Sequence, residues 1–140
     1  MKKIVSTAEA PAAIGPYSQG LRVGSTIYFS GQIALDPKTG ELVSGGIEVQ
    51  TERVMQNVSG LLQAEGLGFD HVVKTTIFLA DIKDFQTVNK IYGAYFKNAP
   101  PARTTIQAGG LPKGARIEIE VIAVANSGSS SGEVAADTSG

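Results

Sequence analysis

Residues 71–80, HVVKTTIFLA, restrict the fold more than any other segment of the chain. They are rich in β-branched types and lack the alternation of apolar and polar residues that marks a strand with one wet face. This pattern predicts an interior strand that is covered on much of both faces. Helices of the same chain can cover only one of those faces here, so the pattern favours an oligomer in which another subunit covers the second.

Two segments have the apolar spacing of helices. From Ile47 to Leu62 apolar residues recur at steps of three and four, and Gly66 follows as a stop signal. A second helix is expected after Asp84, a favoured N-cap residue, and before Pro100-Pro101. Its apolar stripe consists of Phe85, Val88, Tyr92, Tyr95 and Phe96. Helical spacing alone explains this stripe, so packing against a sheet is favoured over a platform for a ligand.

The remaining regular segments are typical of strands. Strands are expected at residues 20–23, 26–35, 102–108 and 115–124, with turns at 24–25, 36–42 and 109–114. In the last strand Ile117 and Ile119 alternate with Glu118 and Glu120, so one face is apolar and the other carries two carboxylates. The order of elements predicts a single α+β domain over residues 1–125, a mixed sheet with two helices on one face. Residues 126–140 are predicted to be a flexible tail or a remnant of cloning.

Composition narrows the classes of function. The formal net charge is -1, which argues against nucleic acid as a partner, and the chain has no Cys. His71 is the only histidine and is expected to be structural, so no metal site is predicted. There is no phosphate-binding loop, dinucleotide fingerprint or nucleophile elbow, so no cofactor is indicated. Without an apolar run of membrane or signal-peptide length, the expected partners include no membrane and the expected location is cytoplasmic.

Three polar residues, Ser30, Arg103 and Glu118, interrupt otherwise apolar or extended segments. Ser30 stands beside Gly31, where a bend in a strand is the favoured interpretation. Arg103 follows Pro100-Pro101, and two interpretations of it are equally good on sequence alone. It either forms a surface salt bridge or presents a planar fork that binds a carboxylate through two hydrogen bonds.

Glu118 and Glu120 also have two interpretations. The favoured one is a solvated strand face on which cations such as Arg116 or Lys74 pair with the carboxylates. The alternative is acid–base chemistry. Two carboxylates on one face of a strand are a weak signal for a glycosidase dyad, because glycoside hydrolysis needs its carboxyl groups on opposite sides of a bond.

Five motifs in order, AAIGPYSQG, FSGQIALDPKTGEL, VVKTTIFLADIKDF, PPART and LPKGARIEIEVIA, resemble the RidA (YjgF/YER057c/UK114) family. The likeness covers residues 3 to about 125. It implies a fold like that of the bacterial trimeric chorismate mutase and a homotrimer with clefts between subunits. It also implies cofactor-free hydrolysis of reactive enamines and imines, such as 2-aminoacrylate, 2-iminopropanoate and 2-iminobutanoate, to 2-oxo acids and ammonia.

The resemblance assigns roles to single positions. Arg103 in PPART corresponds to the arginine that binds the substrate carboxylate, and Glu118 to the glutamate that positions the attacking water, while Glu120 keeps a structural role. The other cleft positions are Tyr17, Ser30, Gly31, Asn89, Thr105 and Pro112. Thr104-Thr105 stands where many relatives have Ser-Cys and the loop before Arg103 is short, two departures that bear on the preferred substrate side chain.

Two other functions remain open from the sequence. One is a non-catalytic module in which Arg103 senses a small carboxylate and the chain regulates a partner. The other is endoribonuclease or translation-inhibitor activity, which the balanced charge and the lack of a basic aromatic stripe make the weaker alternative.

Overall fold

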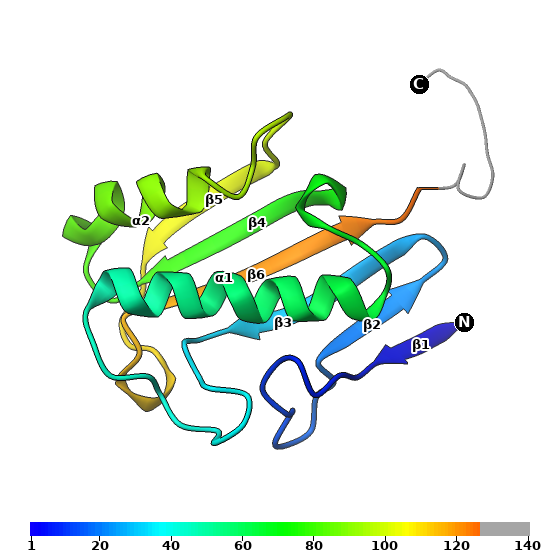
Figure 1. Ribbon diagram of the computed structural model, residues 1–140, viewed down its shortest axis with the longest axis horizontal. Coiled ribbons are helices and arrows are strands. Elements are labelled where there is room, and N and C mark those ends of the chain that lie inside the picture. The colour runs from blue at the N-terminus through cyan, green and yellow to red at the C-terminus, as the bar shows by residue number, and fades with distance from the viewer. Residues whose placement is uncertain (127–140) are drawn as a thin grey trace.

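A six-stranded mixed sheet organises the chain in the computed structural model, which describes residues 1–126 (Figure 1). The strands are β1 (Lys2–Val5), β2 (Gly20–Val23), β3 (Thr26–Gln32), β4 (Val72–Leu79), β5 (Ala102–Gln107) and β6 (Ile117–Val124). Their order is β1-β2-β3-β6-β4-β5, and only β4 and β5 are parallel. Of the predicted tail, only Asn126 lies within the described residues.

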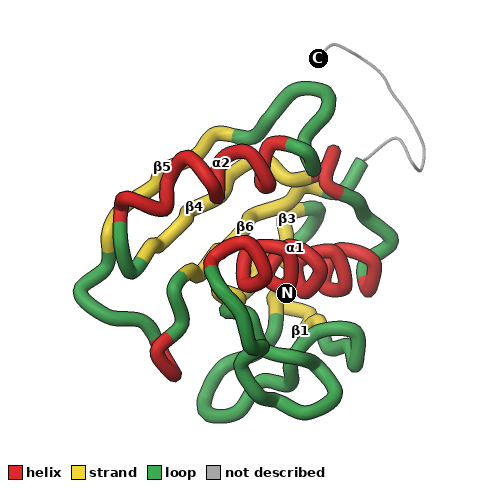
Figure 2. Tube along the Cα trace, turned by 60° about the vertical axis from the view of Figure 1, so that its left-hand side comes forward, coloured by secondary structure: helices red, strands yellow, loops and turns green. Residues whose placement is uncertain are grey.

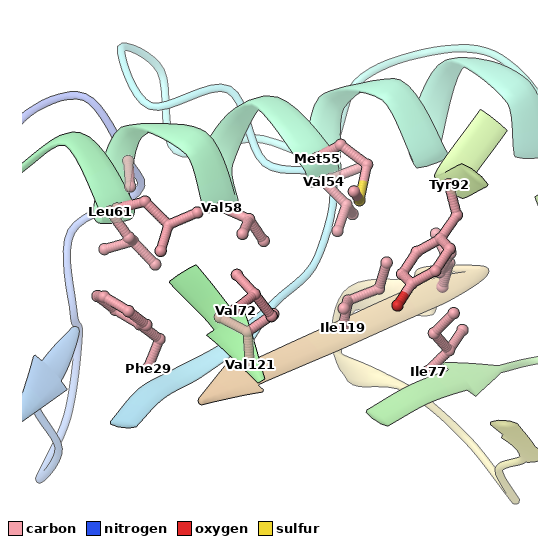
Figure 3. Packing of buried hydrophobic residues seen from close by; sticks show 14 of the residues in the cluster. Phe29, Val54, Met55, Val58, Leu61, Val72, Ile77, Tyr92, Ile119 and Val121 are labelled. Atoms are coloured by element: carbon pink, nitrogen blue, oxygen red, sulfur yellow. The ribbon is translucent and has the colours of Figure 1, made fainter. Parts of the chain in front are cut away.

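The two helices, α1 (Ile47–Ala64) and α2 (Phe85–Gly93), lie on the same side of the sheet (Figures 1 and 2). Short 3₁₀ turns cover Phe69–His71, Ile82–Asp84 and Pro112–Gly114. Helix α1 contacts β3, β6 and α2, and the core fills the space beneath the helices (Figure 3). The predicted α+β domain with a mixed sheet and two helices is therefore confirmed.

Alternation along β6 sets the two faces of the sheet. Ile117, Ile119 and Val121 are buried under the helices, as predicted, whereas Glu118 is half-buried and Glu120 exposed on the other face. Residues paired across neighbouring strands share a face. The face away from the helices has exposed apolar side chains at Ile4, Val23, Tyr28, Ile106 and Val124.

The predicted interior strand at residues 71–80 is confirmed as β4, which lies between β6 and β5. Within one chain, however, only one face of β4 is fully covered. Thr75, Ile77 and Leu79 are buried under the helices, but Thr76 and Phe78 on the other face are only half-buried. That a second copy of the chain covers this face stays a prediction.

The structure differs from the sequence-based assignment at several element ends and in one additional strand. Helix α2 ends at Gly93 rather than at the prolines, because the next residues bond three positions back, as Tyr95 N–H does to the carbonyl of Tyr92 at 3.0 Å. The aromatic stripe continues through this turn because Phe69 packs on Tyr95, with ring centroids 5.0 Å apart. Strand β3 ends at Gln32, after a register shift that begins at Phe29. Strand β1 has no counterpart in the sequence-based assignment.

Candidate active site

A cavity of about 680 Å³ opens where β3 and β6 leave their regular pairing. Among the residues that line it are five of the predicted site residues: Tyr17, Ser30, Gly31, Pro112 and Glu118. Apolar residues of the 11–17 and 33–37 loops complete much of the wall. One half of the predicted site is thus present in a single chain.

A bulge in β3 shapes this cavity. Phe29 pairs with Val121 and Gln32 with Ile119, so Ser30 and Gly31 together stand opposite one residue of β6. Ser30 donates from its Oγ to the carbonyl of Ser18 at 2.6 Å, and its N–H bonds to the carbonyl of Gln19 at 2.9 Å. The favoured interpretation of Ser30 as a bend residue is confirmed, and its bonds tie β3 to the loop that carries Tyr17.

Gln19 holds that loop in place and was not singled out from the sequence. Its side chain is 5% exposed, and its Oε1 accepts the N–H of Thr7 at 2.7 Å. Its Nε2 donates to the carbonyls of Thr7 at 3.0 Å and Pro11 at 2.7 Å. These bonds fold residues 7–19 back on themselves, and the sequence has no spacing signal for such contacts.

The Glu118 carboxylate lies directly against Gly31. A Cβ atom at position 31 would collide with Oε2 of Glu118, and would also crowd its Cγ and Cδ atoms. Only glycine leaves room for the carboxylate in this position. The contribution of Gly31 to the site is therefore its lack of a side chain, which leaves room for the Glu118 carboxylate.

Glu118 is an electrostatically unusual carboxyl group. Partial burial raises its pKa, and repulsion from Glu120 raises it further. The predicted pairing of these glutamates with nearby cations is wrong. Arg116 forms a salt bridge with Asp84 at 2.9 Å, and Lys74 donates to the Thr75 carbonyl at 3.1 Å.

Arg103 lies in a second recess, of about 470 Å³, beside α2. Its Nη1 donates to Oδ1 of Asn89 at 2.7 Å, and its Cζ lies 5.1 Å from the ring centroid of Tyr92 and 5.5 Å from that of Phe85. Arg103 has no salt bridge within residues 1–126, so the surface-salt-bridge interpretation is wrong for the described chain. Pro100 and Pro101 line the same recess.

Thr105 stands on the same face of β5 as Arg103, two residues on. It pairs with Ile77 on the helix side of the sheet. Its Oγ1 is buried and has no hydrogen-bond partner within the described part of the chain. Thr105 lines neither of the two recesses.

The two halves of the predicted site point away from each other. Arg103 pairs with Thr75 and shares its helix-covered face, whereas Glu118 pairs with Phe78 on the open face. With two strand spacings and the rise from Thr75 to Phe78 between them, the two Cα atoms lie about 14 Å apart. A single chain therefore cannot place both side chains on one small ligand.

Within residues 1–126, no three His, Asp or Glu side chains gather as a metal site requires. In the same range no helix has the length and apolar character needed to cross a bilayer. His71 has a structural role: its Nδ1 accepts the N–H of Gly68 at 3.1 Å.

Fold and geometry define a small α+β protein with two half-sites, one cationic and one acidic. A model of the endoribonuclease L-PSP family matches residues 7–125. A Homo sapiens protein named 2-iminobutanoate/2-iminopropanoate deaminase is 53% identical over 124 residues, 89% of this chain and 90% of that protein.

Solved structures agree with the sequence matches. A conserved Rid family protein from Yersinia pestis superposes with a TM-score of 0.87 at 47% identity, covering 89% of this chain and 99% of that one. TdcF of E. coli with bound serine superposes with a TM-score of 0.83 at 40% identity, covering 87% and 98%. The chain belongs to the endoribonuclease L-PSP family, which includes the RidA (YjgF) proteins, and the predicted family membership is confirmed.

Proposed function

We propose that the chain is a cofactor-free deaminase that hydrolyses 2-imino acids and their enamine tautomers to 2-oxo acids and ammonia. The observation that carries the proposal is the pair of complementary half-sites, a cation with free donors and a half-buried carboxylate in a cavity. The name of the human relative, at 53% identity over most of both chains, supports the same reaction.

In this proposal the active site forms between two copies of the chain. The open face of the sheet, with exposed Tyr28, Ile106 and Val124, is the surface that a second copy covers. Arg103 of one protomer then faces Glu118 of its neighbour, and a homotrimer has three such clefts. This arrangement accounts for two half-sites that one chain cannot join.

The reaction needs orientation and one proton shuttle. Arg103 binds the substrate carboxylate through two N–H groups, which holds the C=N carbon beside a water molecule on Glu118. The imine reacts in its protonated form. Glu118 takes a proton from that water as the water oxygen bonds to the carbon, and the C=N electron pair moves to the nitrogen, which gives a neutral carbinolamine. Glu118 then gives this proton to the amine, the C–N bond breaks to release ammonia, and the hydroxyl group passes its proton back to Glu118 as the C=O bond of the 2-oxo acid forms. Glu118 releases that proton to water.

Glu120→Gln is expected to move the acid limb of the kcat/KM profile to lower pH. Glu118 acts as a base only when ionised, so activity falls as pH decreases through its pKa, which lies above the ordinary glutamate value. Removing the Glu120 charge removes one cause of that rise. Steady-state rates across acidic pH measure the shift, and an acid limb that stays in place would contradict the assigned base. Glu9→Gln, a change at an exposed residue outside both recesses, is the control.

Gly31→Ala is expected to lower kcat by about tenfold or more, because the added methyl group occupies the position of the Glu118 carboxylate and a displaced base loses most of its contribution. Gly68→Ala is the control, at an exposed position outside both recesses where an added Cβ meets no neighbour and φ is not positive. A Gly31→Ala protein with native kcat would show that Glu118 does not need this position.

The direct test generates 2-aminoacrylate in place with a dehydratase and measures release of the 2-oxo acid. Acceleration by the purified protein above the rate in water supports the deaminase. Binding of 2-oxo acids without acceleration would select the sensor function instead. Cleavage of RNA by a protein without imine hydrolysis would select the endoribonuclease function that the family's name describes.

A further inference from the structure

The guanidinium of Arg103 is supported from one side by residues of α2. Asn89 accepts one N–H at 2.7 Å, and the rings of Tyr92 and Phe85 lie within 5.1 and 5.5 Å of Cζ. Within residues 1–126 the guanidinium makes no other hydrogen bond. One nitrogen is thus fixed while the remaining donors of the fork stay available to a ligand.

Tyr92 is the buried member of this support. It is 5% exposed, and its hydroxyl oxygen lies 2.7 Å from Oγ1 of Thr75, which is 1% exposed. Figure 3 shows the Tyr92 side chain reaching from α2 toward the strands, with its oxygen on the sheet side. Burial raises the pKa of the Tyr92 hydroxyl, so a neutral phenol faces the guanidinium.

Thr75 contacts both ends of this arrangement. It is the residue of β4 that pairs with Arg103 in β5, and it also forms the hydrogen bond that anchors the Tyr92 ring. One buried residue, Thr75, therefore positions both the backbone of Arg103 and the Tyr92 ring beneath its side chain. A long, flexible side chain held in this way loses less rotamer freedom when it binds a ligand.

We propose that Tyr92 and Thr75 are positioning residues for the carboxylate site: Thr75 fixes the Tyr92 ring, and the ring holds the Arg103 guanidinium with its free edge toward the substrate. The proposal rests on the proposed function, because it assigns the carboxylate to Arg103. Their proposed role is to act through Arg103 and not on the substrate itself. Their effect is on binding, which is shared by the ground state and the transition state.

Tyr92→Leu removes the ring face and is expected to raise KM for 2-iminopropanoate about fivefold, with kcat within about twofold of the native value. Val88→Ala is the matched control, a buried core residue of the same helix outside the recess of Arg103. It is expected to lower the melting temperature, as a core deletion does, and to leave KM unchanged.

Two conservative variants test the hydroxyl pair without the loss of the ring. Tyr92→Phe and Thr75→Val each remove one partner of the 2.7 Å contact. If the two hydroxyl groups act as a unit, the double variant raises KM no more than either single variant does. Independent, multiplying effects on KM would overturn the role of Thr75.

Calorimetric binding of 2-oxobutanoate separates this proposal from the proposed function. A native protein that binds the 2-oxo acid but hydrolyses no imine would reject the function, and the Kd series of the same variants would still decide the role of Tyr92. A Tyr92→Leu protein whose KM and Kd match those of Val88→Ala would overturn the proposal. So would a native protein that binds no 2-oxo acid.

Discussion

Arg103→Ala is expected to lower kcat/KM for 2-iminopropanoate by about 10- to 100-fold, because hydrogen bonds to a charged group contribute about 1.5–3 kcal/mol. The effect is predicted to fall mostly on KM, since the carboxylate is bound before and during the reaction. Steady-state kinetics on imines generated in place measure it. Size-exclusion chromatography of the same sample checks that the assembly persists.

Two further variants define what the arginine supplies. Arg103→Lys keeps the charge but loses the planar fork and its stacking on Tyr92, so it is expected to recover only part of the loss. Lys90→Ala removes an exposed positive charge from α2 at a position outside both recesses. Native kinetics are expected for Lys90→Ala. If it loses as much kcat/KM as Arg103→Ala does, Arg103 contributes only its positive charge and not a specific contact.

Glu118→Gln is expected to lower kcat by about 10²- to 10⁴-fold, the range that a positioned general base contributes, with little change in KM. Glutamine keeps the shape of the side chain against Gly31 but cannot accept the proton. Retention of more than about half of the native kcat would remove Glu118 from the mechanism, because a base contributes at least about 10²-fold. At a pH above the acid limb, where Glu118 is ionised in both proteins, Glu120→Gln is the control on the same strand face.

The same Glu118→Gln substitution is expected to stabilise the fold at neutral pH. The pKa of Glu118 in the folded chain lies above its unfolded value, so its ionisation opposes folding as pH rises through that window. The difference in melting temperature between Glu118→Gln and native protein should therefore shrink below the unfolded glutamate pKa, where both side chains are neutral. Thermal melts at neutral and acidic pH measure the difference.

Apolar periodicity was sufficient to predict most of the fold. The buried stripe of α1 and the alternation in β6 are direct consequences of helical and strand periods, and both are present where expected. The end of α2 was not predictable in this way. Tyr95 and Phe96 continue the apolar spacing beyond Gly93, but they pack on Phe69 from a turn. Apolar spacing therefore predicts which side chains are buried, but it does not predict whether a helix or a turn holds them.

The candidate site was predicted less completely, because its supporting contacts are distant in sequence. The family motifs point to Arg103 and Glu118, but the strand register that separates them onto opposite faces appears only in the folded chain. Likewise, the aromatic stripe of α2 correctly predicts a buried Tyr92, while its position under Arg103 depends on the β4–β5 pairing.

Mixing two inactive variants tests most directly whether neighbouring protomers share the site. Arg103→Ala and Glu118→Gln chains, carrying different tags, are unfolded together, refolded and purified through both tags. Every doubly tagged trimer contains both kinds of chain, so one of its three clefts, about a third of the total, has an intact Arg103 from one chain and an intact Glu118 from the other. We therefore expect the mixture to recover roughly that fraction of native activity. Doubly tagged assemblies that show only the residual activity of their parents would contradict the shared site.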